Sequence, residues 1–209
     1  LYSEKMGRDE YYWPRDDVGE AVLKLASDHL NGKRVMDVAC GFGYLSRVLA
    51  KHGATVTAVD SSVKMIEIAS AKSSDNAVRY RVADSSHVPG DCGTFDTLIC
   101  NMALQDIENA EGTIREMVRL GTEGATLVFS IRHPYTDGCD ANYAQQVRID
   151  NPRPSPGRGD GPYYPPRYHR PLSFYLNTMI DEGVSLRRCE EIVDPKGIPF
   201  ALVIKGLAT

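Results

Sequence analysis

Residues 34–60 hold the pattern that most constrains the fold of this chain. An apolar run at 35–39 is followed by two closely spaced glycines, a segment at 44–52 and a second apolar run that ends at Asp60. The first run is short and rich in β-branched residues, which is typical of a strand buried on both faces. Apolar residues in 44–52 recur at helical spacing, and Gly53 suits a left-handed helix end. The pattern predicts a strand, a glycine turn, a helix and a second, parallel strand.

The glycine turn and the acid that ends the second run indicate a site for a small molecule. Gly41 and Gly43 allow a sharp turn and let a ligand lie against bare main chain. They lie at the carboxyl end of the first predicted strand, where open α/β sheets usually bind ligands. Asp60 can accept hydrogen bonds from both hydroxyls of a ribose. A ligand that contains a nucleoside is therefore predicted.

The class of nucleoside depends on two positions around the turn. A dinucleotide site carries a third glycine where Ser46 stands, and here Asp37 precedes the glycines inside the first strand. The pattern Asp-x-Ala-Cys-Gly-x-Gly followed by Asp60 resembles motif I and the acidic post-motif of class I S-adenosylmethionine-dependent methyltransferases. The resemblance covers about residues 16–209 and is most specific between 33 and 60. A ligand-free glycine turn in another α/β protein is the alternative.

The resemblance implies a fold and a cofactor. The fold class is α/β, with a Rossmann-like, mostly parallel seven-stranded sheet, helices on both faces and an antiparallel terminal hairpin. The cofactor is S-adenosyl-L-methionine. Residues 1–209 are interpreted as a single methyltransferase domain, in which 132–170 form a lid or acceptor-site insertion. A chain of 209 residues is long enough to bury one full core.

Composition limits the classes of partner that are expected. The net charge is −4 and no long basic run is present, so nucleic acid is not expected as a partner. No apolar stretch approaches the length of a membrane span, and no secretory signal is visible. Five cysteines without a C-x-x-C pair indicate a reduced, cytoplasmic setting. The chain begins at Leu1 rather than Met, which leaves open a missing leader, and the oligomeric state is not predicted.

Periodicity and turn residues predict the remaining elements. A first helix is expected over about 16–30, and a second is capped by Ser61 or Ser62 with Val63, Ile66 and Ala69 on one side. Further strands are expected at 78–83, 95–100, 124–131, 184–193 and 198–206, the last two forming the hairpin. Further helices are expected at 110–120 and from about 168 to 182, the latter with proline in its first turn.

The resemblance assigns a set of contacts to the cofactor. These are Tyr12, Asp37, Ala39, Gly41, Gly43, Asp60, Ser61, Met65, Asp84, Ser85, Asn101 and Met102. Tyr12 is either a lid residue or an aromatic that packs on the first helix. Met65 either packs on the adenine or belongs to the core. Asp84 either accepts from the adenine amino group or is only a turn residue.

The acceptor is expected to bind between the fifth strand and the last helix. Residues 132–170 are rich in proline, tyrosine and arginine, and a loop of that length is usually functional or disordered. Candidate acceptor contacts are Asp106, Tyr135, Tyr143, Tyr164 and Tyr168. Asp106 is alternatively a helix cap, and the whole segment is alternatively an irregular flap that shields the sheet.

Two histidines are the candidate catalytic residues. His133 leaves the fifth strand at the ligand edge, and His169 is the second candidate. Each is either a general base or a group that hydrogen bonds the substrate. No cluster of His, Cys, Asp and Glu has metal-ligand spacing, so no metal is expected.

The functional prediction is methyl transfer to oxygen or nitrogen of a small molecule by in-line displacement. Because a sulfonium methyl is already electrophilic, orientation and exclusion of water supply most of the catalysis. Three alternatives remain open. The chain could be a cyclase-type enzyme that uses the same cofactor without methyl transfer, a non-catalytic cofactor-binding module, or a nicotinamide oxidoreductase, which Ser46 disfavours. The acceptor and the pathway are not predicted.

Overall fold

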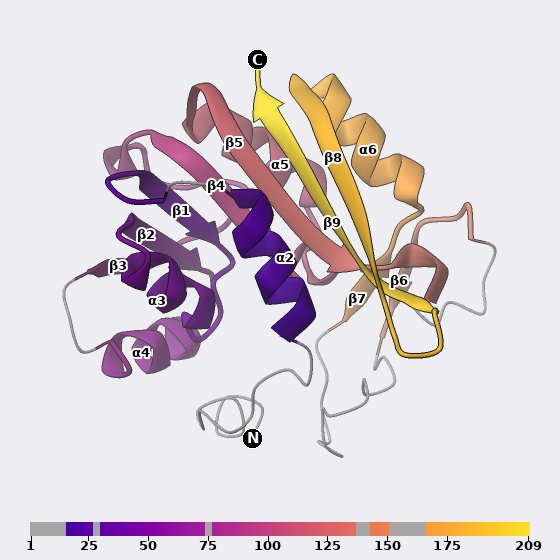
Figure 1. Ribbon diagram of the computed structural model, residues 1–209, viewed down its shortest axis with the longest axis horizontal. Coiled ribbons are helices and arrows are strands. Elements are labelled where there is room, and N and C mark those ends of the chain that lie inside the picture. The colour runs from indigo at the N-terminus through magenta and orange to yellow at the C-terminus, as the bar shows by residue number, and fades with distance from the viewer. Residues whose placement is uncertain (1–15, 27–29, 74–76, 137–142, 151–165) are drawn as a thin grey trace.

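The computed structural model describes residues 16–26, 30–73, 77–136, 143–150 and 166–209. Their main feature is a seven-stranded sheet with strand order β3-β2-β1-β4-β5-β9-β8. The first five strands in this order are parallel, whereas β9 pairs antiparallel with both β5 and β8. The sheet twists across the molecule from β3 to the C-terminal hairpin (Figure 1). The predicted Rossmann-like fold with an antiparallel terminal hairpin is confirmed.

Helices and strands alternate along the chain as far as residue 132. The strands are β1 (Arg34–Val38), β2 (Thr55–Asp60), β3 (Val78–Val82), β4 (Phe95–Asn101), β5 (Gly121–Arg132), β6 (Val147–Ile149), β7 (Arg167–His169), β8 (Val184–Val193) and β9 (Pro199–Ala208). The α-helices are α2 (Asp16–Ala26), α3 (Tyr44–Lys51), α4 (Val63–Ala71), α5 (Ala110–Leu120) and α6 (Leu172–Asp181). Short 3₁₀ turns are η1 (Gly90–Cys92), η2 (Leu104–Asp106) and η3 (Pro134–Thr136).

Each face of the sheet packs against its own helices. On one face, Met36, Leu98 and Leu127 contact residues of α5 and α6. On the other face, Val35 and Val128 pack with residues of α2 and α3. Successive residues of a strand point to opposite faces, so an unbroken apolar run supplies both cores. The two pairs of helices lie on opposite sides of the sheet in Figure 1, as predicted.

Several sequence-based boundaries agree with the structure, and others do not. The bounds expected for α5 and β8 match those observed, and Gly53 has the expected positive φ of 86°. Of the three apolar residues expected on one side of α4, Val63 is 59% exposed and Ala69 is buried. The N-cap of α4 is Ser62, whose side chain accepts from the main-chain N–H of Met65.

The start of α6 lies later in the chain than predicted. Helix α6 begins at Leu172 with Pro171 as its N-cap, whereas residues 167–169 form strand β7 and pair with β6. The two short strands form a separate antiparallel sheet outside the main one. This pairing was not predicted, because three-residue strands carry too few alternating positions to be read from periodicity.

Candidate functional site

The carboxyl ends of β1 and β4 carry unusual backbone conformations. Ala39 follows β1 with a φ of 56°, and Met102 follows β4 with a φ of 53°. Among the described residues, these are the two non-glycine residues with positive φ. The strands that precede them are parallel neighbours in the sheet. Strain of this kind costs about 1–3 kcal/mol per residue and gathers at functional sites, so this edge is the candidate site.

Asp60 ties the glycine turn to the next strand. Its Oδ2 accepts a hydrogen bond from the main-chain N–H of Gly41 at 2.8 Å, and its Oδ1 accepts from that of Ser62 at 2.9 Å. Each carboxylate oxygen has a second lone pair that could accept from another donor. Ser61 between them is exposed. The sequence prediction that Asp60 and the glycines share one site is in accord with this geometry.

The two glycines differ in what surrounds them. A Cβ built on Gly41 would meet nothing within 4 Å. A Cβ built on Gly43 would lie 2.5 Å from the Tyr80 hydroxyl and 2.9 Å from the Cβ of Ala69. The space beside the main chain is therefore open at Gly41. Gly43 is instead required by close packing against β3 and α4.

Asp37 lies beneath the turn, 1% exposed, and accepts a hydrogen bond from Ser46 Oγ at 2.5 Å. Ser46 belongs to α3, so the pair joins the first turn of that helix to β1. Burial raises the pKa of Asp37 to about 7, against the lowering effect of the Ser46 hydrogen bond. The serine that replaces the third glycine of a dinucleotide site is thus the partner of the acid that precedes the turn.

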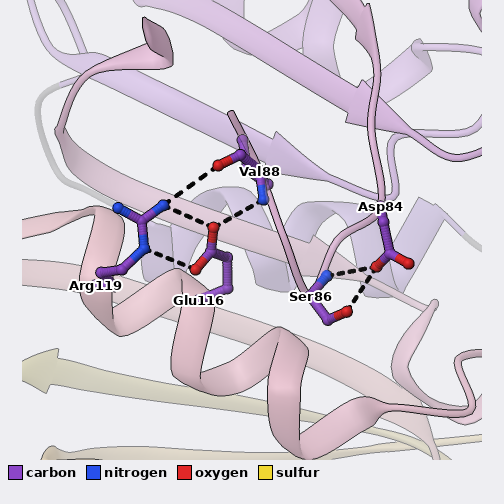
Figure 2. A network of polar contacts seen from close by, with 5 residues as sticks. All are labelled: Asp84, Ser86, Val88, Glu116 and Arg119. Carbon is purple, nitrogen blue, oxygen red and sulfur yellow. Dashed lines mark hydrogen bonds and ion pairs between the residues drawn. The ribbon is translucent and has the colours of Figure 1, made fainter. Parts of the chain in front are cut away.

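Asp84 lies in a tight turn after β3. The turn is closed by a hydrogen bond from the His87 N–H to the Asp84 carbonyl at 3.0 Å. Asp84 Oδ1 accepts from both the N–H and the hydroxyl of Ser86, at 2.8 and 2.7 Å (Figure 2). These bonds hold the pKa of Asp84 below its ordinary value, so the side chain stays an acceptor. Oδ2 has no hydrogen-bond partner in the described part of the chain.

Asn101 and Met102 are held by β5. Ser130 Oγ donates to Asn101 Oδ1 at 2.6 Å and accepts from the Met102 N–H at 2.9 Å. Gln105 donates to the Met102 carbonyl and accepts from the Arg132 N–H at 3.3 Å. The Nδ2 group of Asn101 has no partner within the described ranges, so a donor remains available beside the strained residue. Met65, assigned by resemblance to the adenine, is half-buried on α4.

Arg170 joins the residues directly before α6 to the segment after β4. Its guanidinium is buried and donates to the carbonyls of Leu104, Ile107 and Glu108, at 3.1, 2.9 and 2.6 Å. The ring of Tyr168 lies 5.0 Å from the guanidinium carbon. Strand β7, which ends one residue earlier, lies against η2. The residues around 167–170 are therefore adjacent to the carboxyl end of β4.

The two candidate histidines differ in their free atoms. His169 is 1% exposed, and its Nε2 lies 3.1 Å from the Tyr143 carbonyl. Because a carbonyl only accepts, Nε2 carries the proton and Nδ1 keeps a lone pair. That Nδ1 atom is buried and has no hydrogen-bond partner among the described residues.

His133 has both ring nitrogens engaged. Nε2 lies 3.0 Å from Glu191 Oε1, and Nδ1 accepts from the Tyr135 N–H at 3.3 Å. The sequence favoured His133 over His169 as the base. In the described part of the chain, Nδ1 of His169 has no hydrogen-bond partner, whereas both ring nitrogens of His133 have one.

The predicted tyrosines do not share one environment. Tyr143 packs edge-on against His169, with ring centroids 6.0 Å apart, and its hydroxyl accepts from the Leu172 N–H. Tyr135 is 75% exposed. Asp106 lies in η2, and the cap of α5 is Asn109 rather than Asp106. Tyr12 and Tyr164 lie outside the described residues.

Comparison with known proteins identifies the domain. The family described as "Methyltransferase domain" matches residues 36–129, which include the glycine turn, Asp60, Asp84 and the segment after β4. Residues 36–129 of this chain therefore match a methyltransferase domain. A curated relative of this domain is a ubiquinone biosynthesis O-methyltransferase from Coxiella burnetii, 37% identical over 103 residues. That match covers 48% of this chain and 44% of the relative, so it spans less than half of the relative's length.

Solved structures share the methyltransferase fold over most of the chain. An S-adenosylmethionine-dependent methyltransferase from Mesorhizobium loti has a TM-score of 0.70 and 24% identity, over 91% of this chain and 97% of that one. A magnesium protoporphyrin IX methyltransferase from Synechocystis PCC 6803 with bound SAH has a TM-score of 0.68 and 24% identity. That match covers 92% of this chain and 81% of that one. These likenesses establish the fold.

Sequence reasoning missed several residues that support the methyltransferase site. Ser130 and Arg170 bind groups of distant elements, and Gln105 joins nearby Met102 to distant Arg132. Such long-range pairings leave no local pattern. The signal that could have found Arg170 is its place directly before Pro171, where an α conformation is disfavoured and a strand end is favoured.

The described ranges lack two further features. None of the helices in the described ranges is both long and apolar enough to cross a membrane. In the same ranges, no group of three or more His, Cys, Asp or Glu side chains is arranged to hold a metal ion.

Proposed function

We propose that this chain binds S-adenosyl-L-methionine at the carboxyl edge of the sheet and transfers its methyl group to an oxygen or nitrogen of a small molecule. The observation that carries the proposal is the open space at Gly41, bounded by strained Ala39 and Met102 and by Asp60. The curated relative named above is an O-methyltransferase, which favours oxygen. The domain assignment of 1–209, with 132–170 as the acceptor insertion, is part of the proposal.

The proposed cofactor contacts follow from the free atoms of the site. The Asp60 carboxylate accepts from the ribose hydroxyls, and Asp84 Oδ2 accepts from the adenine amino group, with Met65 against the ring. The Asn101 Nδ2 group and the main chain at Gly41 and Met102 face the methionine part. Asp37 acts from below by holding α3 to β1. Ser61 and Ser85 offer main-chain N–H groups.

Methyl transfer from a sulfonium requires mainly that the protein orient the acceptor and provide one group that accepts a proton. The bound cofactor supplies a methyl group on a sulfonium, which any well-aligned nucleophile can accept. Holding the acceptor in line can supply about 7 kcal/mol or more of barrier reduction. The His169 Nδ1 atom takes the proton of an acceptor hydroxyl, and the bond to the Tyr143 carbonyl keeps the required tautomer. Tyr143 and Tyr168 contribute to the wall on this side.

A calorimetric titration with S-adenosylhomocysteine tests the proposal. We expect one ligand per chain, and affinity reduced at least about tenfold in D60A, because the variant loses charge-assisted acceptors for the ribose hydroxyls. D91N, which changes an exposed aspartate outside the site, is the matched control. Equal affinity of D60A and D91N would refute the assignment of Asp60. NAD and NADP are expected not to bind.

A second assay separates methyl transfer from the cyclase-type alternative and from a non-catalytic module. The protein is incubated with S-adenosylmethionine labelled in the methyl group and with a pool of small metabolites, and the products are analysed by mass spectrometry. A methyltransferase places the label in an acceptor and releases S-adenosylhomocysteine. Label retained in methylthioadenosine indicates a cyclase-type reaction, and label retained in intact cofactor after binding indicates a module.

A further inference from the structure

The turn that carries Asp84 is anchored from outside by three residues of α5. Thr113, Glu116 and Arg119 are spaced by three residues, so they lie along one side of the helix. Thr113 and Glu116 are buried among the apolar residues of a helix that packs on the sheet. A buried carboxylate is costly unless its oxygens are paired. The groups that pair with Glu116 are therefore the part of the chain that α5 holds in place.

Glu116 and Arg119 together hold both main-chain polar groups of Val88. Glu116 Oε1 accepts from the Val88 N–H at 2.7 Å, and Arg119 donates to the Val88 carbonyl at 3.3 Å. Arg119 also binds Glu116 with two hydrogen bonds of 2.7 Å (Figure 2). The Arg119 guanidinium keeps the pKa of Glu116 below its ordinary value, so the ion pair stays charged. We call Thr113, Glu116 and Arg119 the clamp.

Thr113 provides the second attachment. Its hydroxyl donates to the Asn109 carbonyl at 3.1 Å, so it accepts from the Ser85 hydroxyl, 2.9 Å away. The Ser85 hydroxyl is thereby hydrogen-bonded to α5. Its main-chain N–H remains for a ligand. The turn at 84–87 is thus fixed to α5 by Ser85 within it and by Val88 directly after it.

The clamp leaves one acceptor of the turn unoccupied. Asp84 Oδ1 is bound by Ser86, and Oδ2 points away from the clamp in Figure 2. We infer that Glu116, Arg119 and Thr113 are positioning residues that aim Asp84 Oδ2 and the Ser85 N–H at the edge of the adenine ring. The inference rests on the proposed cofactor site and adds to it the residues that set recognition of the base.

The measurement is the ratio of the affinities for two ligands that differ in the base. A merely structural role of the clamp would not change this ratio. S-inosylhomocysteine has a carbonyl oxygen in place of the adenine amino group, so it presents an acceptor to the Asp84 acceptor. The wild type is expected to bind S-adenosylhomocysteine about 10- to 100-fold more tightly in calorimetric titrations, as for a hydrogen bond to a charged group. A general loss of stability would weaken both ligands and leave this ratio unchanged.

The clamp is tested with E116Q, R119M and T113V. Each is expected to reduce the ratio to within a few-fold of unity, while thermal melts report whether the variant folds. T113V breaks the second attachment alone, so it carries the test if E116Q or R119M does not fold. R115Q is the matched control, because Arg115 lies on the same helix and pairs with Glu182 at 2.6 Å, away from the turn. It is expected to keep the wild-type ratio.

A double-mutant cycle with D84N connects the clamp to the base. The amide introduced by D84N can keep the bond to Ser86 through its oxygen while presenting an N–H₂ group, so this variant is expected to prefer the inosyl ligand. Adding E116Q to D84N should bring that inverted ratio back toward unity. A wild type that binds neither ligand refutes the proposed cofactor site. A wild type that discriminates, with clamp variants that discriminate equally, overturns the inference alone.

Discussion

At the scale of single residues, the glycine turn contains two glycines with different tasks. Gly41 faces open space with a φ of 55°, whereas Gly43 faces Tyr80 and Ala69 with a φ of 72°. A side chain at 41 would enter the space proposed for the cofactor. A side chain at 43 would collide with β3 and α4. Binding and stability should therefore separate between these two positions.

The alanine variants of the two glycines test this separation. G41A is expected to lose about 1–2 kcal/mol of unfolding free energy, from its positive φ, and at least about tenfold in affinity for S-adenosylhomocysteine. G43A is expected to lose about 2–5 kcal/mol, because overpacking adds to the backbone strain. Urea denaturation and calorimetry measure the two effects. G41A with wild-type affinity would contradict the account.

Asp37 predicts how stability depends on pH. Its pKa is raised from 3.8 to about 7 in the folded protein. The group therefore stabilises the fold below pH 4, by about 4 kcal/mol relative to alkaline solution, and this contribution is lost as pH rises to 7. The difference in unfolding free energy between the wild type and D37N should change by that amount between about pH 4 and 8. A constant difference in urea denaturation across this range would refute the assignment.

Substitutions of the two histidines are expected to differ in their effect on kcat. With the acceptor found by the labelled-methyl assay, H169Q is expected to reduce kcat by about 10²- to 10⁴-fold, the usual contribution of a general base. H133Q should reduce kcat less than about tenfold, because both nitrogens of His133 already have protein partners. Equal losses in kcat would count against His169 as the base. Unchanged affinity for S-adenosylhomocysteine is the control for folding in both variants.

At the scale of elements, Arg170 links the segment before α6 to the segment after β4. R170M keeps most of the side-chain volume but removes the guanidinium from the carbonyls of Leu104, Ile107 and Glu108, of which Leu104 also accepts from the Ile107 N–H at 3.4 Å. We expect a loss of about 2–4 kcal/mol in urea denaturation.

R148Q is the matched control for this prediction. Arg148 forms an exposed pair with Asp150, and the variant should change stability by less than about 0.5 kcal/mol. If R170M were as stable as R148Q, the three carbonyl contacts would not contribute to the fold.

The elements also differ in how far they could be predicted. Helix α5 and strand β8 carry long periodic patterns, and their bounds were predicted correctly. The prediction of a cofactor site rests on the motif residues of the turn, because a glycine turn and an acidic strand end are local signals. The contacts of Arg170 depend on residues more than 60 positions away, and β7 is too short to show a period. The choice between the histidines could not be made either, because it depends on which ring nitrogens find partners.

At the scale of the whole molecule, the strand order places the proposed cofactor residues that follow β1, β2, β3 and β4 along one edge. Strands β1, β2, β3 and β4 are parallel, so their carboxyl ends meet on the same side of the sheet. Helices on both faces bury the two cores and leave this edge to the loops. The antiparallel pair β9 and β8 extends the sheet beside β5, and His133 directly follows β5.

A crystal structure of the protein with S-adenosylhomocysteine tests the central claim most directly. We expect both ribose hydroxyls within about 3.2 Å of the Asp60 carboxylate oxygens, with the thioether sulfur between the turn at Gly41 and the segment after β4. An adenosyl group bound elsewhere, or a ribose out of reach of Asp60, would contradict it.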